Sequence, residues 1–346
     1  MAGPVLRDPH RLAALDIARG LAVLTMFVAH VQPTGGGDWL LAAAGGERPR
    51  TLFAVAGGIA LGLFVGRMTE RGASAREVRR EVAVRGVFLV ALGLFLQTMT
   101  SGVSIVLDTW GVLFLIMLAF LRVPAMVLAA AAPLLILLGV LVESAAAGGS
   151  LPELAARRTE LTQLADWAVL GSYPLLQWCG YLAVGLALSR VDLADRVVQA
   201  VMLLCGAAVA TFGIGLPLAV EVSEFVVELL VPVAAVGTAV AVVGALLLVT
   251  SVPGVAARVV GVVLWPLRAA GGMPLTLYTA HILALTAWYS SGAPGFGTWT
   301  PWFWLAAGTV AFACVWRALL GQGPVERVMR ALSPAGRRQP AASQPA

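Results

Sequence analysis

The sequence contains no lysine and no asparagine, few charged residues and only three cysteines. Three cysteines in 346 residues cannot build the disulfide framework of a small secreted domain. Charged residues make up 12% of the chain and hydrophobic residues 60%, against about 25% and about 45–50% in a soluble domain. This composition excludes a soluble globular enzyme and a disordered or fibrous protein, and it predicts a polytopic membrane protein.

The absence of lysine and asparagine indicates a GC-rich genome, because the codons of both residues are AT-rich. All 23 basic residues are therefore arginine, and the formal net charge is +5. In a soluble protein this basic balance would suggest nucleic acid as a partner. In a membrane protein a simpler explanation is arginine in the loops that face the cytoplasm, so we expect no nucleic-acid partner.

Ten apolar stretches are long enough to cross a hydrocarbon core of about 30 Å. They are far longer than the roughly 10 residues of a barrel strand, so we expect each to be a helix. The predicted fold class is therefore all-α, a polytopic bundle of about ten transmembrane helices. The stretches lie near residues 12–31, 51–67, 84–100, 104–122, 124–142, 166–189, 197–218, 226–251, 272–290 and 301–320.

The arginines are distributed unequally between the two sides of this predicted bundle. With the N-terminus in the cytoplasm, nineteen of the 23 fall on the cytoplasmic side and four on the other. This bias favours an even number of spans with both termini in the cytoplasm. Residues 252–271 are predicted to be an interfacial amphipathic segment, and the number of spans becomes eleven if they cross. We expect one transmembrane domain over residues 1–333 and a disordered cytoplasmic tail over residues 334–346.

The first predicted helix carries three polar residues on one face. Asp16 and Arg19 are three residues apart and can pair. Arg19 and His30 are eleven apart, which is three helical turns plus about 20°. An ionisable residue inside a membrane is costly, so it usually faces the bundle interior and serves a function. We interpret the stripe as a catalytic site. The structural alternatives are an Asp16–Arg19 pair that only neutralises itself and a His30 that hydrogen-bonds a neighbouring helix.

Other polar and aromatic residues near the ends of predicted spans are candidates for binding substrate or donor. Each also has a structural interpretation. The arginines can snorkel at a helix start, the aspartate can cap a helix, the residues around position 175 can form an interfacial aromatic belt, and the last two can pack in the core. These candidates are Arg48, Arg50, Asp108, Tyr173, Trp178, Tyr278 and His281.

Several common motifs are missing from the sequence. It has no GxxxxGK[ST], no HExxH and no CxxC, so neither a Walker ATPase nor a standard zinc site is predicted. It also has no GxSxG nucleophile elbow. His30 would therefore act as a base toward a substrate hydroxyl or amine, or accept an acyl group itself.

Five stretches of the sequence, taken in order, resemble one family of membrane enzymes. ALDIARGLAVLTMFVAH resembles the first helix of the transmembrane acyltransferase superfamily. Its acyltransferase-3 members share an Arg, ten residues and then a His, which is the spacing of Arg19 and His30. The closer resemblance is to the heparan-α-glucosaminide N-acetyltransferase-like branch and its bacterial DUF418 and DUF1624 relatives. The other four stretches are ERPRTLFAVAGGIALGL, IVLDTWGVLFLI, YPLLQWCGYLAVGLALSR and GGMPLTLYTAHIL.

The resemblance implies a multi-helix bundle that moves an acyl group across the membrane. The donor would be an acyl-CoA, usually acetyl-CoA, on the cytoplasmic side. Because the metal-binding motifs are missing, we expect no metal. The acceptor would be a sugar or glycolipid of the cell envelope. The resemblance also implies a multi-pass protein in the lipid bilayer of the cytoplasmic (inner) membrane, here of a bacterium with a GC-rich genome.

The resemblance also implies roles for individual residues. His30 would be the catalytic histidine, and Arg19 with Asp16 would support the acyl donor or the helix. Arg48 occupies the arginine of the family's Gly-Arg-x-x-x-Leu-Phe stretch, although Glu47 replaces the glycine before it. These roles suit the side chains, because a guanidinium can hold phosphate groups through charge-assisted hydrogen bonds and an imidazole can deprotonate a hydroxyl.

Two other classes of protein stay open. A transporter or exporter of a small polar or lipid-linked substrate could use the same polar stripe. It should show paired broken helices at mid-membrane and internal symmetry, and the sequence displays no clear symmetry. A non-catalytic partner in a membrane assembly is the third class.

Overall fold

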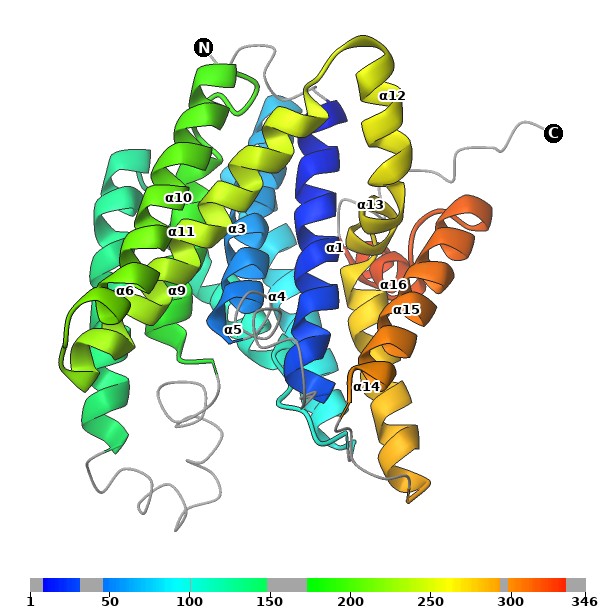
Figure 1. Ribbon diagram of the computed structural model, residues 1–346. Helices are drawn as coiled ribbons and strands as arrows, with labels where there is room; N and C mark the ends of the chain where they lie inside the picture. The colour runs from blue at the N-terminus through cyan, green and yellow to red at the C-terminus, as the bar shows by residue number, and fades with distance from the viewer. Residues whose placement is uncertain (1–8, 32–45, 100, 148–172, 293–297, 334–346) are drawn as a thin grey trace.

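The computed structural model describes residues 9–31, 46–99, 101–147, 173–292 and 298–333 (Figure 1). Within these ranges the regular structure is entirely helical, which confirms the predicted all-α class. The predicted tail at residues 334–346 lies outside the described residues. The helices are α1 (Pro9–Val31), α3 (Glu47–Glu70), α4 (Ala75–Gln97), α5 (Leu107–Met117), α6 (Ala125–Ala147), α9 (Leu175–Leu188), α10 (Arg196–Ala219), α11 (Glu224–Thr250), α12 (Gly254–Val263), α13 (Trp265–Gly271), α14 (Pro274–Ser290), α15 (Trp299–Leu319) and α16 (Pro324–Leu332).

The number of membrane-length helices is smaller than the sequence predicted. Among the described residues, six helices are long and apolar enough to cross a membrane, or seven if one bent pair forms a single span. Within the described residues this count, made by length and composition, is therefore lower than the predicted ten spans. The six helices are α1, α3, α6, α10, α11 and α15.

Four predicted spans correspond to helices that are too short or too charged. α5 has 11 residues, α9 has 14 and α14 has 17, whereas a helix needs about 20 apolar residues to cross the core. α4 has 23 residues, but its first turns carry Arg76, Arg79 and Arg80. Only the second half of α4 is therefore apolar.

The segment predicted to lie at the interface forms the bent pair. α12 and α13 meet at an angle of 57°. Pro266 lies at the junction, where it cannot donate a backbone hydrogen bond to the preceding turn. α12 buries none of its residues, whereas α13 buries Ala269, Ala270 and Gly271. The outer half of the segment is thus exposed, and the inner half is part of the bundle.

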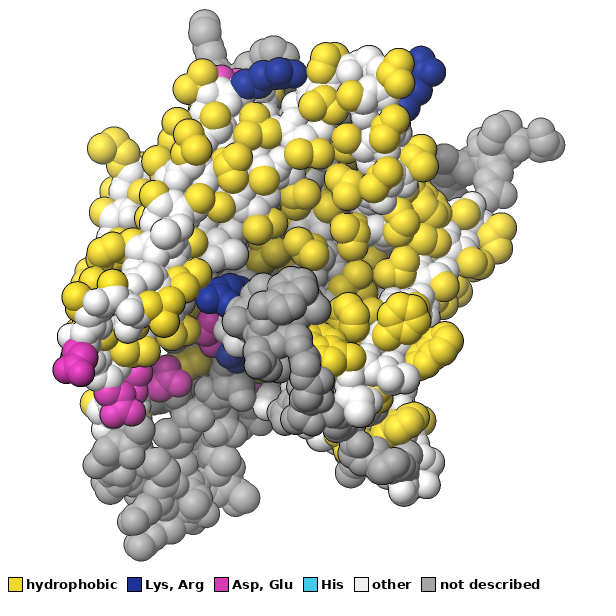
Figure 2. Space-filling view, viewed as in Figure 1, with side chains coloured by type: hydrophobic (Ala, Val, Ile, Leu, Met, Phe, Trp, Pro, Cys, Tyr) yellow, Lys and Arg dark blue, Asp and Glu magenta, His cyan; other side chains and the backbone are white. Residues whose placement is uncertain are grey.

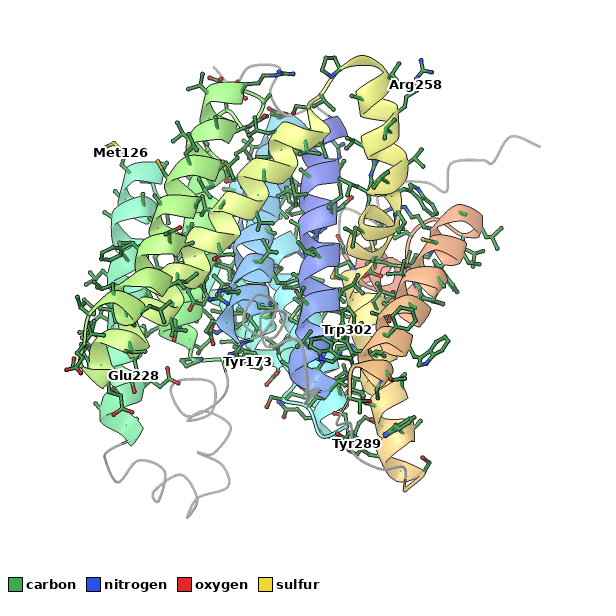
Figure 3. All side chains as sticks on the ribbon, in the orientation of Figure 1. Met126, Tyr173, Glu228, Arg258, Tyr289 and Trp302 are labelled. Carbon is green, nitrogen blue, oxygen red and sulfur yellow. The ribbon has the colours of Figure 1, made fainter. Side chains whose placement is uncertain are left out.

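The two ends of the bundle differ in charge. Figure 3 places Arg258 at one end and Glu228 at the opposite end, and Figure 2 shows acidic side chains gathered near the latter. We call these the Arg258 end and the Glu228 end. Between them the visible surface is dominated by hydrophobic side chains, as expected for a surface that faces lipid (Figure 2). The cytoplasmic position of the Arg258 end stays a prediction.

α1 runs through the middle of the bundle from the Arg258 end toward the Glu228 end (Figure 1). It packs against α3, α11, α13 and α15. Its crossing with α13 is made by glycines. A Cβ on Gly20 would lie 2.1 Å from the backbone oxygen of Leu267, and one on Gly271 would lie 1.6 Å from that of Asp16. The two backbones therefore touch, as small residues permit in membrane helices.

Gly271→Ala should destabilise the protein, because the new methyl group has no room at this crossing. Overpacking of this kind costs about 1–3 kcal/mol. Thermal unfolding of the purified protein in detergent, followed by circular dichroism, measures the effect. Gly261→Ala on α12 is the matched control, because its Cβ would meet nothing within 4 Å. Equal stability of the two variants would contradict this account of the crossing.

Candidate functional site

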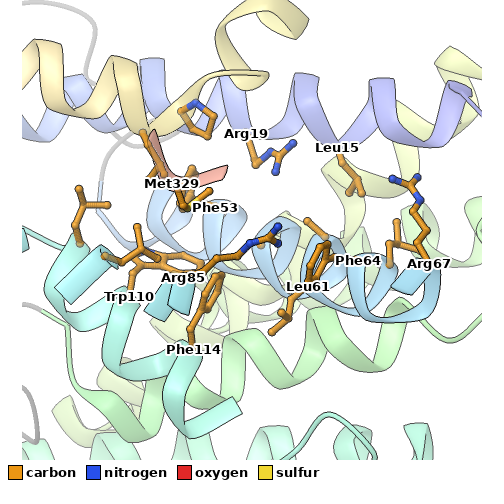
Figure 4. A pocket seen from close by; sticks show the side chains of 17 residues that line it. Leu15, Arg19, Phe53, Leu61, Phe64, Arg67, Arg85, Trp110, Phe114 and Met329 are labelled. Carbon is orange, nitrogen blue, oxygen red and sulfur yellow. The ribbon is translucent and has the colours of Figure 1, made fainter. Parts of the chain in front are cut away.

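A cavity of about 340 Å³ lies among α1, α3, α4, α5, α14 and α16 (Figure 4). Its lining includes three arginines from three different helices: Arg19 of α1, Arg67 of α3 and Arg85 of α4. The lining contains no acidic residue. The cavity therefore has three cationic side chains in an otherwise apolar lining, which suits a ligand that carries anionic groups.

Apolar residues make up the remaining wall of the cavity, and four of them are aromatic. The guanidinium carbon of Arg85 lies 3.7 Å from the centroid of the Phe64 ring, which is a cation–π contact. Trp110 and Phe114 pack edge to face with their ring centroids 5.8 Å apart. Nε of Arg85 is buried without a hydrogen-bond partner among the described residues. A ligand with phosphate groups and an apolar portion would complement both parts of this wall.

The polar stripe predicted on α1 is divided between two places. Arg19 forms an ion pair with Asp16 and lines the cavity, whereas Asp16 is not among the lining residues. His30 lies eleven residues further along, which is about 16 Å of helix. His30 does not line the cavity and packs against another helix.

His30 and His281 form a stacked pair. Their ring centroids are 5.0 Å apart and their planes differ by 2°. Phe27 lies 5.0 Å from the His281 ring, and the edge-on ring of Tyr278 lies 4.9 Å from it. His281 is 3% exposed, and His30 is partly exposed. The sequence singled out both histidines separately, and the structure brings them together from α1 and α14.

Both helices of the histidine pair also reach the cavity. On α1 the cavity residues are Leu15 and Arg19, and on α14 they are Pro274 and Leu275 at its first turn. His281 lies six residues after Leu275, which is about 9 Å along the helix axis. The pair thus lies further along the two helices that form one side of the cavity.

A polar cluster occupies the start of α3. Arg50 forms an ion pair with Glu47 and lies 5.7 Å from the centroid of the Tyr173 ring. The hydroxyl of Tyr181 donates to Glu47 at 3.5 Å. Arg48 lies on the same helical turn and is partly exposed. Figure 3 places Tyr173 toward the Glu228 end, so this cluster lies at the end opposite Arg258.

Three other predicted site residues hold α5 to its neighbours. Asp108 is 1% exposed and accepts a hydrogen bond from Gln97 of α4 at 2.7 Å. Trp178 of α9 packs edge to face against Trp110 of α5 at 6.2 Å. The hydroxyl of Tyr278 accepts a hydrogen bond at 3.0 Å from the backbone N–H of the residue before α5. Their observed contacts are structural, and a role in binding stays a prediction.

Sequence reasoning missed Arg67 and Arg85 as site residues, because it counted them only as evidence for topology. A signal was present for both, since Arg67 ends the predicted span 51–67 and Arg85 lies within the predicted span 84–100. An arginine inside an apolar stretch is itself an indication of function.

Sequence reasoning also missed α16, which follows the last predicted span. Its Met329 lines the cavity. Its buried Glu326 accepts hydrogen bonds from the backbone N–H groups of Leu275 at 2.7 Å and Thr276 at 3.1 Å, so it caps the start of α14. Ser333, just after α16, hydrogen-bonds the buried Glu81 of α4. α16 therefore fixes one wall of the cavity.

The fold and the site together define a multi-pass helical membrane protein with an arginine-lined cavity among its helices. The family model described as "Heparan-alpha-glucosaminide N-acetyltransferase, catalytic" matches residues 11–213, which is more than half of the chain. The chain therefore belongs to this family, as the resemblance predicted. A second model, described as "Protein of unknown function (DUF418)", matches residues 175–335. No curated protein and no solved structure matches the chain.

The two matched regions meet in the site. Arg19, Arg67, Arg85 and His30 lie in the acetyltransferase match, whereas His281 and the α14 and α16 residues of the cavity lie in the DUF418 match. The cavity and the histidine pair thus need both parts of the chain.

Glu326→Ala should lower the stability of the protein, because it leaves the first backbone N–H groups of α14 without their buried partner. Such a loss costs about 1–3 kcal/mol. Thermal unfolding in detergent checks this, with Glu70→Ala at the exposed end of α3 as the matched control. If both variants unfold at the same temperature as the wild type, Glu326 does not stabilise the start of α14 in this way.

Proposed function

We propose that the protein is an integral membrane acyltransferase. It takes an acyl group, in the simplest case acetyl, from acyl-CoA bound in the arginine-lined cavity and transfers it to a sugar or glycolipid of the cell envelope. The observation that carries the proposal is that α1 and α14 both run from the cationic cavity to one histidine pair. The acetyltransferase family match supports the reaction type.

The donor fits the cavity by its chemistry. Coenzyme A carries phosphate groups, which Arg19, Arg67 and Arg85 can hold through charge-assisted hydrogen bonds. Its pantetheine arm is long and largely uncharged. It would extend along α1 and α14 toward the histidines, over a distance of about 16 Å on α1. The predicted cytoplasmic position of the Arg258 end would let the donor enter from the side where acyl-CoA is made.

The acceptor would approach from the other end. Glu47, Arg50 and Tyr173 supply a carboxylate, a guanidinium and an aromatic ring there. Carboxylate and guanidinium groups hydrogen-bond hydroxyls, and aromatic rings supply apolar contact area, so this combination suits a sugar. His30, the more exposed histidine of the pair, would contact the acceptor group that receives the acyl chain.

A transporter is the alternative function, and one observation favours it. The bent pair α12–α13 is a discontinuous segment of the kind that transporters use. Transporters built on inverted repeats use two such segments in corresponding positions, and the described residues contain one bent pair. Acyl transfer therefore accounts for more of the observations than transport does.

Deletion of the gene should remove one acyl modification from an envelope glycan or lipid, as measured by mass spectrometry of the envelope. The wild-type gene should restore it, and His30→Ala should not. A transporter would instead change which intact molecules reach the envelope, without loss of one acyl mass. Full complementation by His30→Ala would show that His30 is not a catalytic residue.

Arg85→Ala should weaken the binding of acetyl-CoA, because it removes one charge-assisted contact. A hydrogen bond to a charged group contributes about 1.5–3 kcal/mol, which corresponds to about a 10- to 150-fold increase in Kd. Calorimetric titration of the purified protein with acetyl-CoA measures this. Arg258→Ala, the same change at an exposed arginine of α12, should leave Kd unchanged. Equal affinity of both variants would place the donor elsewhere.

A further inference from the structure

Within the part of the chain that the structure describes, His281 has one ring nitrogen with a partner and one without. Nδ1 lies 3.3 Å from the carbonyl oxygen of Leu277, one turn earlier on α14. A carbonyl oxygen only accepts hydrogen bonds, so Nδ1 carries the proton of the neutral ring. Nε2 then carries the lone pair, and it is buried without a hydrogen-bond partner among the described residues.

Packing alone does not explain a histidine at this position. Phe27, His30 and Tyr278 surround its ring with aromatic side chains. A phenylalanine could fill the same space, and it would not leave a buried acceptor unsatisfied, which is unfavourable. A hydrogen bond from one ring nitrogen to a backbone carbonyl commonly fixes the tautomer of a histidine whose other nitrogen takes part in catalysis or binding.

The stacked histidine rings do not hydrogen-bond each other. Imidazole lone pairs and N–H groups lie in the plane of the ring. The His30 and His281 planes are parallel within 2° with their ring centroids 5.0 Å apart, and neither Nδ1 of His30 nor Nε2 of His281 has a hydrogen-bond partner among the described residues. His281 therefore does not act by hydrogen-bonding His30, and its Nε2 is left without a partner among the described residues.

His281 follows the cavity residues of its own helix by fewer residues than His30 does. It lies six residues from Leu275, whereas His30 lies eleven residues from Arg19, so the separations along the helices are about 9 Å and about 16 Å. A thioester that extends from the cavity along α14 would reach His281 first.

We propose that Nε2 of His281 is the atom that accepts the proton of the acceptor, with His30 beside it to hold the acceptor. The inference rests on the proposed acyl transfer, and it assigns to His281 the base role that the sequence suggested for His30. The acceptor hydroxyl or amine gives its proton to Nε2 as its oxygen or nitrogen bonds to the acyl carbonyl carbon. The C–S bond then breaks, the electron pair leaves with the CoA sulfur, and the imidazolium returns the proton to that sulfur.

The test compares His281→Asn and His281→Gln with the wild type. Asparagine can keep the donor to the Leu277 carbonyl, and glutamine extends an amide toward the Nε2 position, but neither accepts a proton at neutral pH. The assay follows transfer of radiolabelled acetyl from acetyl-CoA to extracted membrane material. In both variants kcat should fall about 10²- to 10⁴-fold while KM for acetyl-CoA stays unchanged. His10→Gln, at the third histidine of the chain, should retain the wild-type rate.

The possible outcomes separate this inference from the proposed function. A wild-type protein that transfers no acetyl group overturns the proposed function. A wild-type protein that does so, together with a His281→Asn or His281→Gln variant at near-wild-type kcat, overturns only the role of His281. Where those variants do not accumulate in the membrane, His281→Ala is assayed with added imidazole. Recovery of transfer supports proton acceptance by the missing ring, and no recovery counts against it.

Discussion

The backbone contact between α1 and α13 is the constraint on which the site depends. Gly20 and Gly271 bring the two helices together without side chains between them. Arg19 directly precedes Gly20, so this contact fixes where Arg19 enters the cavity. α14 follows α13 after a short break, so the same contact fixes the start of α14 relative to α1. A shift of either helix would therefore alter the cavity and separate His30 from His281.

The class of fold could be predicted from the sequence, but the lengths of several helices could not. Composition is sufficient for an all-helical membrane protein, and the structure agrees. Hydropathy does not distinguish a helix that crosses the bilayer from a short apolar helix enclosed by its neighbours. α5 is the clear case, because Leu107, Trp110 and Leu113 are buried in the protein and give the segment a membrane-like composition within 11 residues. In α4, by contrast, the arginines of the first turns make a helix of 23 residues too charged to be counted as a membrane span.

The candidate site was predictable only where it depends on neighbours in sequence. The Asp16–Arg19 ion pair follows from a spacing of three residues, and the structure contains it. The contacts of His30 with His281, of Arg85 with the cavity and of Glu326 with α14 join helices that are far apart in the chain. No periodicity within one segment encodes such contacts. The sequence could therefore indicate His30 as a catalytic residue and His281 as a binding residue, but it could not indicate that the two are in contact.

The cap that Glu326 places on α14 has a consequence for biosynthesis. α16 follows every other described helix, so ribosomes make it after the remaining walls of the cavity. The cavity is complete only when α16 has returned to the bundle and closed the start of α14. A partly translated chain would therefore lack one wall of the cavity. Truncation within α16 would therefore disrupt the cavity, although it removes none of the three arginines that line the cavity and neither histidine of the pair.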